Sequence, residues 1–181
     1  MAESKQPAWC WLDLEMTGLD SLTDRIIEAA VIVTSPDFSE TLNEWETAVF
    51  QPPEVLASMD EWCQKTHGAS GLTERVPHGI TEDALDEKLA ATVDQFWSEK
   101  PVILCGNSIG QDRKFVDRYL PRFASKLHYR MLDVSSFKVV FQERYDQSFP
   151  KRGTHRALDD IRESIAELQF YLQAVDVTRL S

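Results

Sequence analysis

The chain has 181 residues, of which 43% are hydrophobic and 27% charged, and this is the composition of a globular protein with room for a full core. Disordered, collagen-like and low-complexity classes are excluded by the same balance. The longest apolar run, at residues 29–33, is far shorter than the ~20 residues that cross a bilayer, so no membrane span is predicted. With 19 Lys and Arg against 30 Asp and Glu, the net charge of −11 argues against a protein that holds a long nucleic acid by electrostatics alone.

The cysteines and the first residues bear on the compartment. Cys10, Cys63 and Cys105 are odd in number and widely spaced, which predicts neither a disulfide framework nor a zinc site. Cys10 and Cys105 sit in apolar runs and are interpreted as small buried hydrophobic residues in a reducing compartment. Residues 1–7 show neither the apolar stretch of a signal peptide nor the Arg-rich pattern of a transit peptide, so a cytoplasmic location is expected.

In chain order, the sequence predicts strands first and then a mixture of helices and strands. No repeat or compositional break interrupts the chain, so a single domain over residues 1–181 is expected. Runs of β-branched, aromatic and aliphatic residues predict strands, and Ala, Leu, Glu and Lys at helical spacing predict helices. The predicted strands are 8–15, 25–34, 45–50, 101–105 and 129–134, and the predicted helices are 55–67, 84–98, 110–120, 135–144 and a last one with an apolar stripe at 161, 165, 168 and 172.

The order of these elements predicts an α/β fold. Three leading strands joined by short links favour antiparallel pairing, whereas the later strand–helix–strand unit favours parallel pairing. We therefore expect a mixed central sheet flanked by helices.

Acidic residues occur within the first predicted strand and just after the fourth. Asp13 and Glu15 are two residues apart in an apolar strand, so their side chains share a face, and this arrangement is costly unless cations lie between them. Asp112 lies in the first turn of the helix that follows the fourth strand, at the sheet edge where ligands collect in α/β folds. Each feature also has an ordinary structural interpretation, as a surface pair or as an acid that stabilises a helix N-terminus.

A third cluster, at residues 153–160, leads into the last helix. His155 and Asp160 would differ by 140° around a continuous helix and could not meet. If residues 154–157 form a loop instead, His155 can lie over the site that Asp160 faces from the first helical turn. The pattern alone leaves the choice between Asp159 and Asp160 open.

Together these segments resemble the three motifs of the DEDDh family of 3′–5′ exonucleases. The matching stretches are DLEMTGLD at 13–20, GNSIGQD at 106–112, and GTH at 153–155 continuing to DDIRES at 159–164. The resemblance is strongest to the oligoribonuclease branch and runs from the first strand to the final helix. It implies a ribonuclease-H-like exonuclease fold, a homodimer, and removal of nucleotides from the 3′ end of very short RNA, dinucleotides especially, to give nucleoside 5′-monophosphates.

The resemblance also implies roles for individual residues. It identifies Asp160, five residues after the histidine, as the ligand in the third motif. Four carboxylates, those of Asp13, Glu15, Asp112 and Asp160, would bind two Mg²⁺ or Mn²⁺ ions, for which oxygen ligands are suited. His155 would act as the general base.

The substrate-binding residues are likewise implied by resemblance. Leu19, Trp62 and His67 would contact the nucleotide. The substrate's other end would be held by Ser108, Gln111, Arg130 and Ser135, and Tyr129 would reach across from the partner subunit. Glu28 lies in the second predicted strand, where it either supports the metal site or faces solvent.

Two other functions remain open from the sequence. A DEDDh exonuclease that acts on longer RNA or single-stranded DNA would share the metal residues but would need an open groove. A catalytically silent module is disfavoured because all five catalytic positions are filled. Short substrates carry few phosphates, so they agree with the acidic composition.

Overall fold

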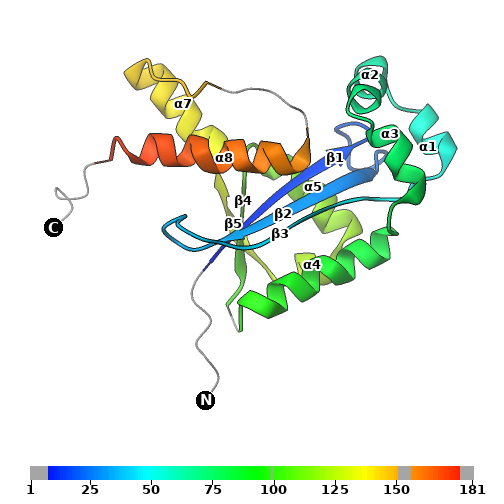
Figure 1. Ribbon diagram of the computed structural model, residues 1–181, viewed down its shortest axis with the longest axis horizontal. Helices are drawn as coiled ribbons and strands as arrows, with labels where there is room; N and C mark the ends of the chain where they lie inside the picture. The colour runs from blue at the N-terminus through cyan, green and yellow to red at the C-terminus, as the bar shows by residue number, and fades with distance from the viewer. Residues whose placement is uncertain (1–7, 99, 151–155, 176–181) are drawn as a thin grey trace.

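A computed structural model describes residues 8–98, 100–150 and 156–175 of the chain (Figure 1). Its centre is one five-stranded sheet with the order β3-β2-β1-β4-β5. The strands are β1 (Trp9–Met16), β2 (Ile26–Thr34), β3 (Thr41–Ala48), β4 (Val102–Gly106) and β5 (Leu127–Asp133). The first three strands pair antiparallel, and β4 pairs parallel with both β1 and β5, which confirms the predicted mixed sheet.

Helices cover both faces of this sheet. Their bounds are α1 (Pro53–Ala57), α2 (Glu61–Ala69), α3 (Leu72–Arg75), the 3₁₀ helix η1 (Val76–His78), α4 (Glu82–Phe96), α5 (Gly110–Tyr119), α6 (Pro121–Ala124), α7 (Val134–Tyr145) and α8 (Ala157–Leu172). In Figure 1, α7 and α8 lie on one side of the sheet and α4 lies on the other, while α1, α2 and α3 gather beyond one end of β1 and β2.

Strand alternation divides the core between the two faces. From β1, Leu12 and Leu14 pack with residues of α4 and α5, whereas Trp11 packs with Ile161 and Leu168 of α8. Because side chains two apart share a face, the odd-numbered residues of β1 face α8. This is the face on which Asp13 and Glu15 lie.

Two of the predicted boundaries are wrong. The predicted helix 55–67 is two helices, α1 and α2, because the Asp60 side chain accepts a hydrogen bond from the Cys63 N–H at 2.7 Å and so caps a new helix. The third strand runs from Thr41 to Ala48 rather than over 45–50, since its first half is an exposed, polar part of the sheet edge without an apolar run. The short helices α3 and α6 were not predicted. Among the described residues, no helix combines the length and apolar character needed to cross a membrane.

Candidate active site

Three carboxylates meet where β1 passes beneath the start of α8. Oxygen atoms of Asp13, Glu15 and Asp160 all lie within 4.8 Å of one another. The alternation of β1 brings the first two together, and the first turn of α8 brings the third over the same face. The neighbouring acid, Asp159, pairs instead with Arg162 of its own helix at 2.9 Å. The structure therefore brings together three of the four predicted metal ligands.

The fourth predicted ligand approaches from α5. Asp112 lies in the first turn of this helix, and its carboxylate Oδ1 accepts a hydrogen bond from the Leu14 backbone N–H at 2.9 Å. The side chain is buried, and burial raises the pKa of Asp112 to about 7. Asp112 is also the charged neighbour that raises the pKa of Asp13 most. It thus belongs electrostatically to the same cluster.

Burial, and after it repulsion between these acids, makes their ionised forms unfavourable. Burial, and after it repulsion by Asp112 and Glu15, raises the pKa of Asp13 well above its ordinary value. Burial, and after it repulsion by Asp160, raises the pKa of Glu15 to about 8. A cluster of this kind holds either protons or cations near neutral pH. Its donors are all carboxylate oxygens, which fit a hard divalent cation such as Mg²⁺ or Mn²⁺.

The residues expected to contact a nucleotide differ in their exposure to solvent. Leu19 and Trp62 are large apolar side chains that are 75% and 62% exposed. His67 is buried instead, where its Nε2 donates to the Met16 carbonyl oxygen at 3.0 Å and its Nδ1 lies 4.0 Å from Glu15 Oε2. The structure places His67 directly behind a carboxylate of the cluster. His155 lies outside the described residues.

One carboxylate organises the residues expected at the substrate's far end. Asp133 Oδ1 accepts hydrogen bonds from the Ser108 N–H, the Ser135 N–H and the Ser135 hydroxyl, at 2.9, 2.9 and 2.6 Å. Ser108 has a φ of 56°, an unusual value for a residue other than glycine. Gln111 donates from Nε2 to the Leu19 carbonyl oxygen and so joins α5 to the turn after β1.

Tyr129 and Arg130 lie apart from the carboxylates on β5, an edge strand of the sheet. The Tyr129 side chain is 74% exposed, and the Arg130 guanidinium lies 5.3 Å from the centre of its ring. The Tyr129 ring also stacks on His128, with 4.4 Å between ring centroids. Both side chains are therefore presented on the surface of the chain.

Sequence reasoning left Glu28 open and missed its partner. Glu28 is buried on β2 directly beside Glu15 of β1, and its Oε1 accepts a hydrogen bond from Arg75 Nη1 at 2.6 Å. The single acid in the run Ile26–Thr34 was a signal for a buried charge. Arg75 is 47 residues away in a four-residue helix, where no periodicity points to it.

Comparison with known proteins gives this geometry its context. The exonuclease family model (RNase_T) matches residues 10–168. An oligoribonuclease of Francisella tularensis is 48% identical over 165 residues, which cover 90% of this chain and 93% of the relative. The oligoribonuclease of Vibrio cholerae serotype O1 is 48% identical over 170 residues, or 91% of this chain and 93% of the relative. The chain belongs to the oligoribonuclease family of exonucleases.

Solved exonuclease structures share the fold of this oligoribonuclease family member. The zinc-bound form of an E. coli exonuclease I complex with single-stranded DNA matches with a TM-score of 0.72 at 14% identity, over 93% of this chain. Exonuclease I of Methylocaldum szegediense matches with a TM-score of 0.69 at 18% identity, over 92% of this chain. The chain spans only 41% and 40% of these two longer proteins. The matches confirm the predicted ribonuclease-H-like exonuclease fold.

Proposed function

We propose that this oligoribonuclease family member removes nucleotides from the 3′ end of very short oligoribonucleotides, dinucleotides above all, and releases nucleoside 5′-monophosphates. One observation carries the proposal: in a chain 48% identical to oligoribonucleases, carboxylates of Asp13, Glu15 and Asp160 converge, with Asp112 buried beside them. No other cluster of three or more potential metal-binding side chains occurs among the described residues.

The four carboxylates of Asp13, Glu15, Asp112 and Asp160 would hold two divalent cations, Mg²⁺ or Mn²⁺. When bound, such a pair supplies positive charge that stabilises the attacking and the leaving oxygen during displacement at phosphorus. One carboxylate oxygen of Asp112 accepts a hydrogen bond from the Leu14 N–H, and this bond fixes the orientation of the carboxylate. His67 would orient Glu15 in a similar way. A hydrogen bond to the Met16 carbonyl oxygen holds the His67 ring beside the Glu15 carboxylate.

The chemistry is hydrolysis of the last phosphodiester bond. His155 takes a proton from the attacking water, whose oxygen forms a new bond to phosphorus while the bond from phosphorus to the 3′-oxygen breaks. The 3′-oxygen leaves and gains a proton, so the products are a nucleoside 5′-monophosphate and a chain shorter by one residue. Histidine suits the role because its ordinary pKa lies close to neutral pH.

The proposed preference for short substrates follows from residues that would bind both ends of the oligonucleotide. Leu19 and the exposed Trp62 offer apolar surfaces to bases, and stacking of a base on an aromatic ring tolerates every sequence. Ser108, Gln111, Arg130 and Ser135 would close the site around the substrate's other end, with the planar guanidinium of Arg130 suited to a terminal phosphate.

We further propose that the chain acts as a single-domain homodimer in the cytoplasm. The 74% exposed Tyr129 on β5 would reach the partner's site. The described cysteines are all buried and free, as expected in a reducing compartment.

The test is a timed digestion of a 5′-phosphorylated diribonucleotide beside a longer RNA oligomer, each with Mn²⁺ and with a chelator. Asp112→Asn is the matched control, because its amide oxygen still accepts from Leu14 while a ligand charge is lost. Faster, metal-dependent loss of the dinucleotide is the expected result. Equal or preferential cutting of the longer RNA would instead indicate an open groove, and no cutting at all would indicate a binding module.

A further inference from the structure

A fifth carboxylate, that of Glu28, lies next to the cluster and is not one of its proposed ligands. Its side chain is 3% exposed and stands beside Glu15 across the β1–β2 ladder, where its charge raises the pKa of both Glu15 and Asp13. A buried charge that repels its neighbours needs a partner. Arg75 of α3 is that partner, with Nη1 2.6 Å from Glu28 Oε1.

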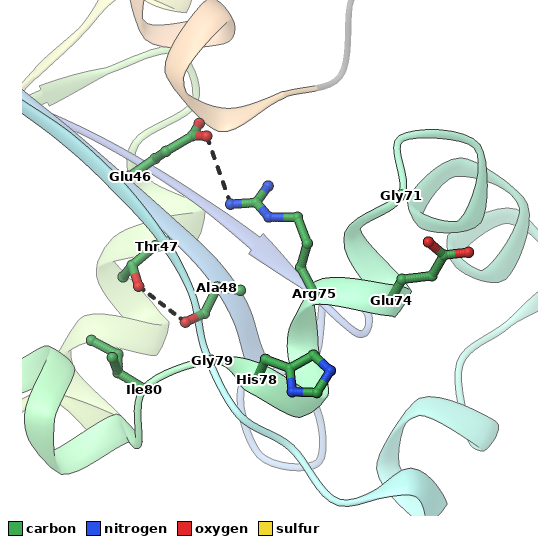
Figure 2. A pocket seen from close by; sticks show the side chains of 9 residues that line it. All are labelled: Glu46, Thr47, Ala48, Gly71, Glu74, Arg75, His78, Gly79 and Ile80. Atoms are coloured by element: carbon green, nitrogen blue, oxygen red, sulfur yellow. Dashed lines mark hydrogen bonds and ion pairs between the residues drawn. The ribbon is translucent and has the colours of Figure 1, made fainter.

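The same guanidinium reaches a second carboxylate on β3. Arg75 Nη2 lies 3.6 Å from Glu46 Oε1, a contact drawn in Figure 2. The same Glu46 oxygen also accepts a hydrogen bond from Arg156 Nη2 at 3.2 Å. Arg75 thus bridges two acids that come from adjacent strands of the sheet.

Both acids support the beginning of α8. Arg156 immediately precedes this helix, and the backbone N–H of Ala157, its first residue, lies close enough to Glu28 to lower the pKa of that carboxyl. The Arg156 carbonyl oxygen accepts the Asp160 N–H at 2.9 Å, which closes the turn that carries the proposed ligand. The start of α8 therefore rests on, that is, packs beside, Glu28 through the Ala157 backbone, and it is joined to Glu46 through the Arg156 side chain.

We infer that Arg75 is a positioning residue of the carboxylate centre: it clamps Glu28 and Glu46, on which the start of α8 rests, and so holds Asp160 against Glu15. The inference rests on the proposed function for the assignment of these carboxylates as metal ligands. Arg75 forms its ion pairs with Glu28 and Glu46, neither of which is a proposed metal ligand. It acts through the two acids that it bridges.

This positioning role predicts that removal of Arg75 changes the cation affinity in the direction opposite to that expected from simple electrostatics. Arg75 is a positive charge near a cation site, so Coulomb's law alone makes its removal strengthen cation binding. If Arg75 positions the ligands, its removal weakens cation binding, because Glu28 and the start of α8 are freed to shift. The sign of the change therefore separates the two effects.

The experiment is calorimetric titration of the full chain with Mn²⁺, without substrate, for the wild type, Arg75→Met and Arg75→Lys. A cavity of about 540 Å³ borders Arg75 and Glu46, so the unbranched Met side chain has room at this position (Figure 2). Arg122→Met is the matched control, because Arg122 likewise bridges several acids, at 2.7 Å to Asp83 and 3.8 Å to both Asp86 and Glu87 of α4, on the opposite side of the sheet.

Loss of a residue that orients metal ligands typically costs about 10–100-fold in metal affinity, and a weakening of this size is expected for Arg75→Met. Arg75→Lys should fall between Arg75→Met and the wild type, because a single ammonium cannot bridge both acids as the planar guanidinium does. Arg122→Met should match the wild type. In an activity assay with the dinucleotide, Arg75→Met should need a higher Mn²⁺ concentration for half-maximal rate than the wild type. Its kcat at saturating Mn²⁺ should stay close to the wild-type value.

Unchanged or tighter Mn²⁺ binding by Arg75→Met would overturn the inference, as would an equal weakening in Arg122→Met. If Arg75→Met does not fold, wild-type affinity in Arg75→Lys overturns it instead. Failure of the proposed function has a different signature: the wild type itself would bind no Mn²⁺ in the titration.

Discussion

The raised pKa of Glu15 predicts that the metal-free protein loses stability as the pH rises. Below its usual pKa of 4.5 the side chain is protonated in both the folded and the unfolded chain, so it has no effect there. Between pH 4.5 and about 8 the unfolded chain has ionised while the folded chain still holds the proton, and this difference weakens folding progressively. Because a tenfold change in proton affinity equals about 1.4 kcal/mol, the shift corresponds to about 5 kcal/mol at pH 8.

Glu15→Gln tests this magnitude because glutamine has no charge at any pH. In the presence of a chelator, its free energy of unfolding should match that of the wild type near pH 4.5 and exceed it increasingly toward pH 8, by up to about 5 kcal/mol. The assay is urea unfolding followed by far-UV circular dichroism at several pH values. Glu54→Gln, at an exposed position of α1, is the control that should show no such gain.

Two outcomes would refute this reasoning: a stability difference between Glu15→Gln and wild type that does not grow with pH, or an equal gain in Glu54→Gln. Added Mn²⁺ should stabilise the wild type most at high pH, where protons compete least for the carboxylates. The variant should lose that stabilisation together with its activity. Glu15 would then be both a residue required for the reaction and one that destabilises the metal-free protein.

Three further predictions concern the reaction. Asp112→Asn should lower kcat by more than about 100-fold, because loss of a proposed metal ligand should cost more than loss of a residue that orients one. Its far-UV circular dichroism spectrum should stay unchanged, because the Asn amide oxygen still accepts the hydrogen bond from the Leu14 N–H. Trp62→Ala should weaken dinucleotide binding by about 1–3 kcal/mol, measured by inhibition with a non-hydrolysable analogue, without changing the unfolding midpoint, because the ring is 62% exposed. The KM for a dinucleotide should rise only shallowly with salt, since each phosphate contact adds about 0.7 to the logarithmic slope; a steep slope would indicate many phosphate contacts and a longer bound strand.

The carboxylate cluster was predictable because local rules decide it. Alternation along a strand places Asp13 and Glu15 on one face whatever the strand packs against, and a helix that begins just before Asp160 turns that side chain toward the same face. The choice of Asp160 over Asp159 came from resemblance, and the structure supplies the physical reason: Asp159 is engaged with Arg162.

The supporting residues were not predictable because they depend on contacts between distant segments. Glu28 was recognisable as an acid in an apolar strand, but its environment depends on Arg75, which is 47 residues away beyond two short helices. The burial of His67 likewise depends on a hydrogen bond to Met16, 51 residues earlier. Periodicity describes which face a residue occupies, and it carries no information on which distant side chain completes that face.

The acidic composition and the preference for short substrates have a common physical basis. Much of the positive charge is already paired within the fold: Arg25, Arg75, Arg113, Arg122, Arg156 and Arg162 each form an ion pair with a carboxylate. Bound cations would neutralise the carboxylate centre and the phosphate at the scissile bond. Each further phosphate of a longer strand would then meet a surface of net negative charge without a cation to offset it. Binding should therefore weaken as the substrate lengthens, which is the reverse of what a basic groove produces.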